Sequence, residues 1–335
     1  MRDTTRRLPT FPRSLRLALV VLACATAPAT SFAQQDYPVH TVTIVVPFVP
    51  GGTTDLMGRL LAAKLEQRLG KTFVVENKPG AGALTAAVGI ARAAPDGYTL
   101  MISPSSAMAT NVTLYKKLPY DPVADFVPIA LLVRTPFALA VNPTLGVTSV
   151  ADLIARAKAK PGALAYASPG PGTPHHLFAE LFQTLTGTQF THVPYKGVAP
   201  ALNDVVAGHV QLIFTDIAPA LGMIQEGKLT ALGVTSRARV AALPNLPPLD
   251  DSVAGFDATS WQMVIAPAAM PASVVTKLND EISTVMREPD IAKQMVEMGM
   301  LPVERASSEA LRAFVKSEID TWGAVVRNAG IAGSQ

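Results

Sequence analysis

Cysteine is almost missing from the chain, and long apolar runs are confined to its start. Cys24 is the single cysteine among 335 residues. It lies in the segment 1–33, where a basic stretch, an apolar stretch and small residues ending at Ala33 are typical of a cleavable secretory signal. A chain cut after Ala33 keeps no cysteine, which excludes disulfides and cysteine-bound metals. No later apolar run reaches the roughly 18 residues of a membrane span.

The start of the chain leaves the export route open. Cys24 follows a Val-Leu-Ala tripeptide, so a lipoprotein signal cut before Cys24 is the alternative to cleavage after Ala33. Arg6-Arg7 is a weak indication of twin-arginine export. The leader also carries five arginines and one aspartate, so its removal changes the formal net charge from +3 to about −1. The basic pI is therefore no evidence for nucleic-acid binding, and we expect a periplasmic protein.

Short apolar runs alternate with helical patterns along the rest of the chain, which predicts βαβ units and mostly parallel sheets. The alternation begins again at Phe137, and Ser149 with Asp152 fits a capping box for the helix that follows. A chain of this length usually forms two domains. We expect two lobes, the first of them discontinuous, because the C-terminal helices need a sheet to cover. The first lobe would hold residues 36–135 plus 259–335, and the second would hold residues 136–258.

Two glycine-rich turns join a strand to a helix at comparable places in the two halves. They read PFVPGGTTD (47–55) and ASPGPGTPHH (167–176). Such turns expose backbone N–H groups at the positive end of a helix, where an anion can bind. Either turn alone could simply end a strand. The two turns together favour a cleft that holds one small anion between two α/β lobes.

The glycine patterns do not fit a nucleotide site. Residues 70–72, Gly-Lys-Thr, look like the end of a P-loop, but position 65 is a leucine and the tripeptide leads from a helix toward a strand. The pairs Gly80/Gly82 and Gly170/Gly172 lack the third glycine of a dinucleotide-binding fingerprint. We therefore expect no nucleotide cofactor.

Catalytic and metal-binding patterns are equally weak. The chain has no Gly-x-Ser-x-Gly motif. His176 and Glu180 have helical i, i+4 spacing, but a single such pair more often forms a hydrogen bond than a metal site. His175 and His176 diverge by about 100° on a helix, so they would not chelate together. His192 and His209 have no carboxylate partner at a recognisable spacing. The residues predict no catalytic site, no metal and no cofactor.

Three charged residues near the turns keep two interpretations each. Lys196, beside Tyr195, is either an anion contact or a solvated loop cation. Asp55 suits the first turn of its helix, and Asp216 suits a turn at a strand end. The alternative is that Asp55 or Asp216 receives an ammonium group or orients a water molecule.

Seven segments resemble the signature blocks of the Bug receptors, the extracytoplasmic solute-binding proteins of tripartite tricarboxylate transporters. They are PFVPGGTTD, VENKPGAGA, PDGYTL, YDPVADFVPIA, LAYASPGPGTPHHL, VPYKGVAPALNDVVAGHV and LTALGVTSRARVAALPNLPPL. The resemblance covers nearly all of residues 36–330, in order. It implies a type 2 periplasmic binding protein, a Venus flytrap of two α/β lobes joined by crossing strands, which is not an enzyme. Similar receptors bind di- and tricarboxylates, acidic amino acids or aromatic acids through backbone amides, hydroxyls and bridging waters.

Carried over block by block, the resemblance implies a ligand site at the strand ends of both lobes. Its members would be Phe48, Gly51, Gly52, Asp55, Ser103 and Ser105 in the first lobe, and Ser168, Gly172, Thr173, His176, Tyr195, Lys196 and Asp216 in the second. The chain has Thr53-Thr54, a serine-rich segment at 103–106 and a doubled histidine at 175–176 where relatives vary. These loops choose the ligand, so the family does not identify it.

We therefore expect the protein to capture a small carboxylate and deliver it to a membrane permease, as a monomer that binds no nucleic acid. Neither glycine loop contains an arginine, so helix N-termini and neutral donors would hold the anion, each contact worth roughly 1.5–3 kcal/mol. One alternative is an exported hydrolase that uses His176 or Ser168. Another is a receptor without its own permease that feeds a sensor kinase.

Overall fold

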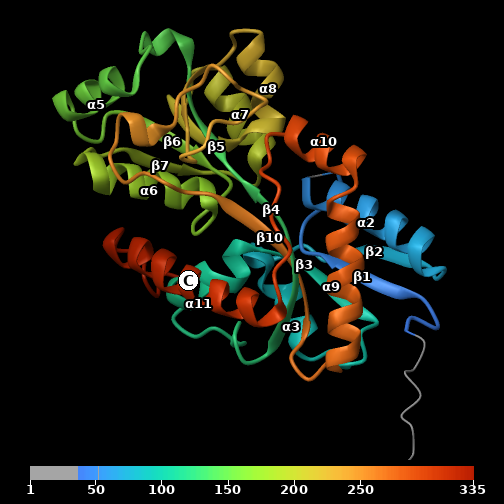
Figure 1. Ribbon diagram of the computed structural model, residues 1–335. Coiled ribbons are helices and arrows are strands. Elements are labelled where there is room, and N and C mark those ends of the chain that lie inside the picture. Colours follow the sequence, from blue (N-terminus) through green and yellow to red (C-terminus); the bar gives the residue numbers. More distant parts are fainter. Residues whose placement is uncertain (1–36, 52) are drawn as a thin grey trace, which may run out of the picture. The chain divides into compact units, whose positions relative to one another are not determined.

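The computed structural model describes residues 37–51 and 53–335 (Figure 1). The expected signal peptide, with Cys24 and the cleavage site at Ala33, lies outside the described residues, and so does Gly52. The described strands form two five-stranded sheets. None of the helices in this part of the chain is both long and apolar enough to cross a membrane.

The first sheet has the strand order β2-β1-β3-β10-β4. Its strands are β1 (Val42–Val46), β2 (Phe73–Asn77), β3 (Thr99–Pro104), β4 (Phe126–Thr135) and β10 (Ser260–Pro267). Strand β1 is parallel to β2 and β3, whereas β10 runs antiparallel to β3 and β4. The chain leaves this sheet after β4, forms strands β5 to β9 elsewhere, and returns to this sheet through β10.

The second sheet has the strand order β7-β6-β8-β5-β9. Its strands are β5 (Phe137–Val141), β6 (Ala165–Ser168), β7 (Thr191–Pro194), β8 (Leu212–Asp216) and β9 (Thr230–Val234). Strand β6 is parallel to β7 and β8, and β5 is antiparallel to β8 and β9. Only Pro136 separates β4 from β5, so the chain passes directly from one sheet to the other.

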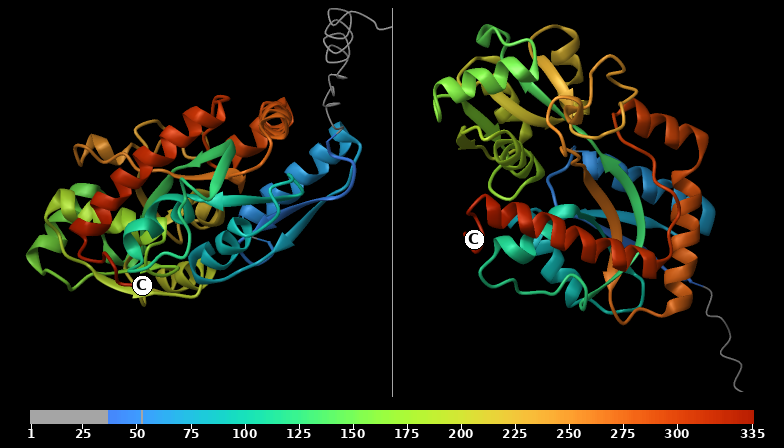
Figure 2. Two further views of the ribbon diagram at one scale, coloured as in Figure 1. Left: turned by 90° about the horizontal axis from the view of Figure 1, so that it is seen from below. Right: turned by 60° about the vertical axis from the view of Figure 1, so that its left-hand side comes forward.

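The two sheets are mixed, which refines the prediction of mostly parallel sheets. Every antiparallel pair includes β10 or β5, the strands through which the chain enters a sheet from the other one. Strands β3 and β8 end at the edge where the chain crosses between the sheets, which we call the junction. Strands β10 and β5 start at that edge, so each runs antiparallel to its neighbours. The right-hand view of Figure 2 shows β4 in green and β10 in orange side by side. The expected division into lobes 36–135 plus 259–335 and 136–258 stays a prediction.

Helices cover both sheets. The α-helices are α2 (Thr53–Leu69), α3 (Leu84–Ala91), α4 (Asn111–Leu114), α5 (Val150–Ala159), α6 (Pro174–Thr186), α7 (Val198–Val206), α8 (Ile217–Gln225), α9 (Ala272–Met286), α10 (Pro289–Glu297) and α11 (Ser308–Asn328). Short helical turns are η1 (Ala81–Ala83), η2 (Ser106–Thr110), η3 (Pro143–Leu145) and η4 (Leu249–Asp251). The Ser149 hydroxyl accepts a hydrogen bond from the Asp152 N–H and caps α5, as the sequence predicts.

One hydrophobic core cluster includes side chains from both sheets, among them Met263 of β10 and Phe137 of β5. In the same cluster, the C-terminal helix α11 packs against α6. The rings of Trp322 on α11 and Phe178 on α6 lie 5.4 Å apart, and Figure 2 shows the end of α11 (red) next to α6 (yellow-green). Buried apolar area of this kind stabilises by about 25 cal/mol per Å². Helix α11 therefore ties the two sheets together.

Candidate ligand-binding site

The predicted site residues in the described ranges gather at the junction between the sheets. Because β10 is antiparallel to both β3 and β4, the strands β1, β2, β3 and β4 all end at the edge where β4 passes into β5. Strands β6, β7 and β8 end at the facing edge, because β8 is antiparallel to β5 and parallel to β6. Loops at the carboxyl ends of strands are where ligands bind in open α/β sheets. The topology thus places both glycine loops at one junction.

The loop after β1 is held by Asp55, in the first turn of α2. Its carboxylate accepts hydrogen bonds from the Gly51 N–H at 2.9 Å, the Asn77 amide at 2.9 Å and two Arg59 nitrogens at 3.0 Å. Asn77 also donates to the Phe48 carbonyl at 3.0 Å. The Asp55 carboxylate therefore holds the Gly51 end of the loop directly and the Phe48 end through Asn77.

Asp55 is also buried, with 2% of its surface exposed. The hydrogen bond from Arg59 is the main cause that lowers its pKa to about 2, against the opposing effect of burial. With four donors already in place, Asp55 supports the loop in this structure, and its contact with a ligand stays a prediction. Arg59 and Asn77 were missed in the sequence. The i, i+4 spacing of Asp55 and Arg59 was the available signal, while Asn77 reaches the loop from the next strand.

The loop after β3 is tied to the crossing strand. Ser105 and Ser260, the first residue of β10, have their hydroxyl oxygens 3.2 Å apart. Ser103 is fully buried, and its hydroxyl donates to the Pro104 carbonyl at 3.3 Å. Ser105 is 5% exposed, so both predicted serines lie beneath the surface of this edge.

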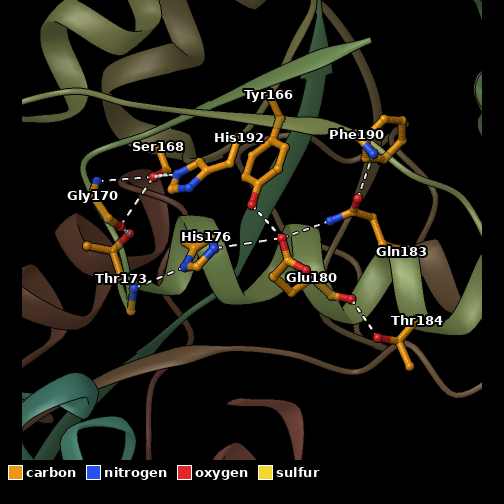
Figure 3. A network of polar contacts seen from close by, with 11 residues as sticks. Tyr166, Ser168, Gly170, Thr173, His176, Glu180, Gln183, Thr184, Phe190 and His192 are labelled. Carbon is orange, nitrogen blue, oxygen red and sulfur yellow. Dashed lines mark hydrogen bonds and ion pairs between the residues drawn. The ribbon is translucent and has the colours of Figure 1, made fainter. Parts of the chain in front are cut away.

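The loop after β6 is held by two histidines (Figure 3). The Ser168 hydroxyl lies 2.6 Å from His192 Nε2 and accepts the Gly170 N–H at 3.1 Å. The Gly172 N–H donates to His176 Nδ1 at 3.0 Å. This partner of His192 could not be predicted from spacing, because Ser168 lies 24 positions away and on a different strand.

Thr173, the N-cap of α6, also takes part in this loop. Its hydroxyl donates to the Gly170 carbonyl at 2.7 Å and makes no side-chain cap hydrogen bond to the helix. Thr173 therefore closes the turn, and the first turn of α6 begins without a side-chain cap.

Three aromatic rings stack beneath this loop. The ring of His192 stacks against those of Tyr166 and His176, with centroids at 4.8 and 4.3 Å, and the Tyr166 and His176 centroids are 6.2 Å apart. The Tyr166 hydroxyl donates to Glu180 Oε1 at 2.6 Å, and His176 Nε2 lies 3.7 Å from the same oxygen. The His176–Glu180 pair expected from its i, i+4 spacing is thus in contact, at a distance longer than a hydrogen bond. Figure 3 shows the stack and Glu180 from close by.

Burial keeps both histidines of the stack neutral. It lowers the pKa of His176 to about 3, with a smaller contribution from His192, and lowers the pKa of His192 to about 4. Since His176 Nδ1 accepts from Gly172, the ring proton lies on Nε2, facing Glu180. The loop thus rests on two neutral rings, and the donor and acceptor nitrogens of His176 are fixed by its partners.

Two glycines receive aliphatic side chains from across the junction. A Cβ at Gly172, which has φ +73°, would lie 2.1 Å from a methyl carbon of Leu114 on α4. A Cβ at Gly299, which has φ +79° and follows α10, would lie 2.9 Å from the Cβ of Ile217 on α8. A larger residue at Gly172 would require Leu114 to move, and a larger residue at Gly299 would require Ile217 to move. These contacts bring helices of one sheet onto loops of the other.

The loops after β7 and β8 carry the remaining predicted residues. The Tyr195 hydroxyl donates to Asp204 Oδ2 at 2.7 Å, and desolvation with this neighbour raises its pKa to about 12. Lys196 is exposed and forms no hydrogen bond or ion pair with the described residues. Asp216 Oδ2 lies 3.1 Å from His175 Nε2. His209, which the sequence left without a carboxylate partner, lies 3.4 Å from Asp204.

Other parts of the described chain offer less for ligand chemistry. No group of three or more metal-ligating side chains occurs among residues 37–51 and 53–335. A hollow of about 320 Å³ lies beside α4 and α11 and contains none of the predicted site residues. The junction therefore remains the candidate site.

Two mixed α/β sheets joined by β4 and β10, with glycine loops on facing edges, define the fold of a two-lobed periplasmic solute-binding protein. Residues 57–331 match the model of the tripartite tricarboxylate transporter family receptor. The chain belongs to this family, as its signature blocks predict.

Relatives and solved structures agree with this assignment. Protein BugT of Bordetella pertussis is 35% identical over 317 residues, which cover 94% of this chain and 97% of BugT. The R. palustris protein Rpa4515, solved with adipate, is 38% identical with a TM-score of 0.82, covering 88% of this chain and 99% of that one. MatC (Rpa3494) from Rhodopseudomonas palustris, solved with bound malate, is 32% identical with a TM-score of 0.78, covering 87% and 100%.

Proposed function

We propose that this protein is a periplasmic receptor that captures a small carboxylate at the junction of its sheets and delivers it to the permease of a tripartite transporter. The observation that carries the proposal is the set of helix starts at the second sheet's junction edge. Helices α6, α7 and α8 all begin there, and their N-caps Thr173, Gly197 and Asp216 make no side-chain cap hydrogen bond. Uncapped N–H groups at the positive end of a helix bind anions.

A contrast within the same sheet supports this interpretation. Strand β5 runs the other way, so α5, which follows it, starts at the opposite edge. There Ser149 caps the helix with its hydroxyl. In this sheet the helix start that faces away from the junction is capped by a side chain and those at the junction are not; α9, which follows β10 in the first sheet, also lacks a side-chain cap.

The neutral surroundings of the loop suit reversible capture. His176 and His192 fix the loop without a positive charge, and each charge-assisted hydrogen bond to a carboxylate contributes roughly 1.5–3 kcal/mol. A few such contacts account for micromolar binding, which corresponds to about 8 kcal/mol. Two related structures, one solved with adipate and the other with malate, support a carboxylate as the ligand class.

An exported hydrolase is the weaker alternative. Ser168 is fully buried, and its hydroxyl is engaged by His192 and the Gly170 backbone. His176 is 4% exposed and is held between Gly172 and Glu180. Neither side chain is placed to attack a substrate, so both are assigned to holding the loop.

A thermal-shift screen of organic acids on the mature protein tests the proposal. A ligand at 100 times its Kd adds about 2.7 kcal/mol to the free energy of unfolding, which is easily measured. We expect at least one small carboxylate to stabilise the protein and to be recovered chemically unchanged. Stabilisation by sugars or cations alone, or conversion of the acid to a product, would contradict the proposal.

A further inference from the structure

The two tryptophans of the chain donate to the same carboxylate oxygen. Trp261, in the crossing strand β10, and Trp322, on α11, have their indole nitrogens 2.7 and 3.0 Å from Glu318 Oε2. Both tryptophans are buried. Glu318 and Trp322 lie one turn apart on α11. The Glu318 carboxylate therefore fixes the Trp322 ring and ties α11 to the start of β10 at the junction.

Trp322 also reaches the helix that follows the glycine loop of the second sheet. Its ring lies 5.4 Å from that of Phe178 on α6, and the Phe178 ring lies 4.9 Å from that of Phe137. Phe137 is the first residue of β5, and its ring meets His175 in the first turn of α6 at 4.6 Å. These aromatic contacts connect α11 to α6 and to the point where the chain enters the second sheet.

A second contact from the same side reaches the glycine loop itself. Leu114, the last residue of α4, is buried against Gly172, where a Cβ would lie 2.1 Å from a Leu114 methyl carbon. Gly172 directly precedes Thr173, the N-cap of α6. Leu114 and Trp322, which belong to helices that follow strands of the first sheet, thus both contact α6 or its loop.

The C-terminal segment 332–335 holds α4 by its backbone. Gly333 donates its N–H to the Thr113 carbonyl at 3.0 Å, and Gln335 donates to the Leu114 carbonyl at 3.2 Å. The Gln335 carbonyl accepts from the Lys116 N–H at 3.0 Å. Helix α4 has only four residues, too few for a helix that is stable by itself. Its position, and with it the position of Leu114, therefore depends on these contacts.

Helix α11 lies close against α4 at a glycine. A Cβ at Gly323, the residue after Trp322, would lie 2.9 Å from Thr113 Oγ1. A larger residue at this position would require the Thr113 side chain to move. The two contacts with α6 and its loop, through Leu114 and through Trp322, are therefore made by helices that are packed together.

We propose that α4, α11 and residues 332–335, which together we call the brace, position the glycine loop of the opposite sheet for its ligand. Leu114 and Trp322 are positioning residues, since they act through Gly172 and Phe178. A shift of α6 moves the N–H groups at its start, so the brace sets how tightly a carboxylate is held and how fast it leaves. This inference rests on the proposed capture of a carboxylate at the junction.

Hydrogen exchange of the mature protein without added ligand tests the positioning of the loop. The variants are Leu114→Ala, Trp322→Leu and a chain that lacks residues 332–335. Loss of a brace contact allows the start of α6 to open locally more often. We expect the peptide that covers residues 170–178 to exchange roughly 2- to 30-fold faster in each variant, the range for remote mutations that act on a site.

The shortened chain is designed to spare α11. The N–H groups of Gly330 and Ile331, which donate to Arg327 and Val326 at the end of α11, are kept. The three backbone hydrogen bonds to residues 113–116 are lost. Faster exchange at the start of α6 in this chain would therefore be carried through α4.

Two further variants separate positioning from loss of stability. Leu278→Ala removes a fully buried leucine side chain from α9, which packs against β4 of the first sheet. It matches Leu114→Ala in the volume removed and lies outside the brace, so exchange of residues 170–178 should stay as in the parent protein. Trp322→Phe keeps a ring on Phe178 and should restore most of the protection that Trp322→Leu loses. Melting curves identify any variant that fails to fold.

Calorimetry and stopped-flow dissociation test the effect on the site. The probe is the tightest binder to the parent protein among succinate, malate, glutarate and adipate. We expect Leu114→Ala and Trp322→Leu to weaken binding by roughly 2- to 30-fold and to release the acid faster. Trp322→Phe should retain most of the affinity, and Leu278→Ala should bind as the parent protein does.

The two assays distinguish this inference from the proposed function. If residues 170–178 exchange no faster in the brace variants than in Leu278→Ala, the inference is overturned. It is also overturned if exchange is faster while affinity and dissociation are unchanged. If none of the acids binds the parent protein, the proposed function fails and the role of the brace in binding fails with it, while the exchange rates still decide whether the brace positions the loop.

Discussion

Replacing His176 by phenylalanine removes the acceptor that the Gly172 N–H uses at 3.0 Å and keeps a ring in the stack with His192. His176 is 4% exposed, so water cannot readily replace the lost acceptor. A buried N–H left without a partner costs about 1–3 kcal/mol. We expect His176→Phe to lower the free energy of unfolding by this amount and to weaken ligand binding, because the glycine loop loses its support.

Urea unfolding and calorimetry of two matched variants measure this effect. His176→Asn keeps an acceptor near the position of Nδ1 and loses the ring, so it should retain more ligand affinity than His176→Phe. The unfolding transition gives the cost to the fold, and calorimetry gives the cost to the site. If His176→Phe is as stable as the parent protein and binds ligand equally well, the histidine does not support the loop and the reasoning is wrong.

Three more predictions concern the charges and the lobes. The folded protein keeps His176 and His192 neutral, with pKa values of about 3 and 4, below the ordinary 6.5. Between pH 6.5 and these lowered pKa values, the unfolded chain therefore binds more protons than the folded protein. Stability should therefore fall as pH drops from 6.5 toward 4, and urea unfolding of His192→Gln should show a smaller fall. Asp55→Asn should lower the free energy of unfolding by about 1–3 kcal/mol, because Arg59 loses its charged acceptor; an unchanged urea midpoint would contradict the role given to Asp55. Limited proteolysis should yield no stable fragment 36–135, because that segment lacks β10 and the helices α9 and α11; recovery of such a folded fragment would refute the discontinuous first lobe.

Local patterns account for most of what the sequence predicts. The alternation of apolar runs and helical stretches predicts the strands on both sides of Phe137, because side-chain periodicity is set by the backbone itself. The cap of α5 is predicted for the same reason, since Ser149 and Asp152 are three residues apart. The positions of both glycine loops follow from the strand–turn–helix order.

Contacts between distant segments could not be predicted in this way. The antiparallel direction of β5 and β10 depends on where the chain crosses between the sheets, and nothing in their composition records it. His192 meets Ser168 because β6 and β7 are neighbours in the sheet. The orientation of Asp216 depends on His175, which is 41 positions away. Such pairs are fixed by the assembled sheets rather than by spacing.

A structure of the mature protein bound to the tightest acid from the thermal-shift screen tests the central claim most directly. We expect the carboxylate of the ligand within hydrogen-bonding distance of the N–H groups at the start of α6, with the ligand between the loops after β1 and β6. A ligand bound away from the junction, or a carboxylate held instead by lysine or arginine side chains on the surface, would contradict the account.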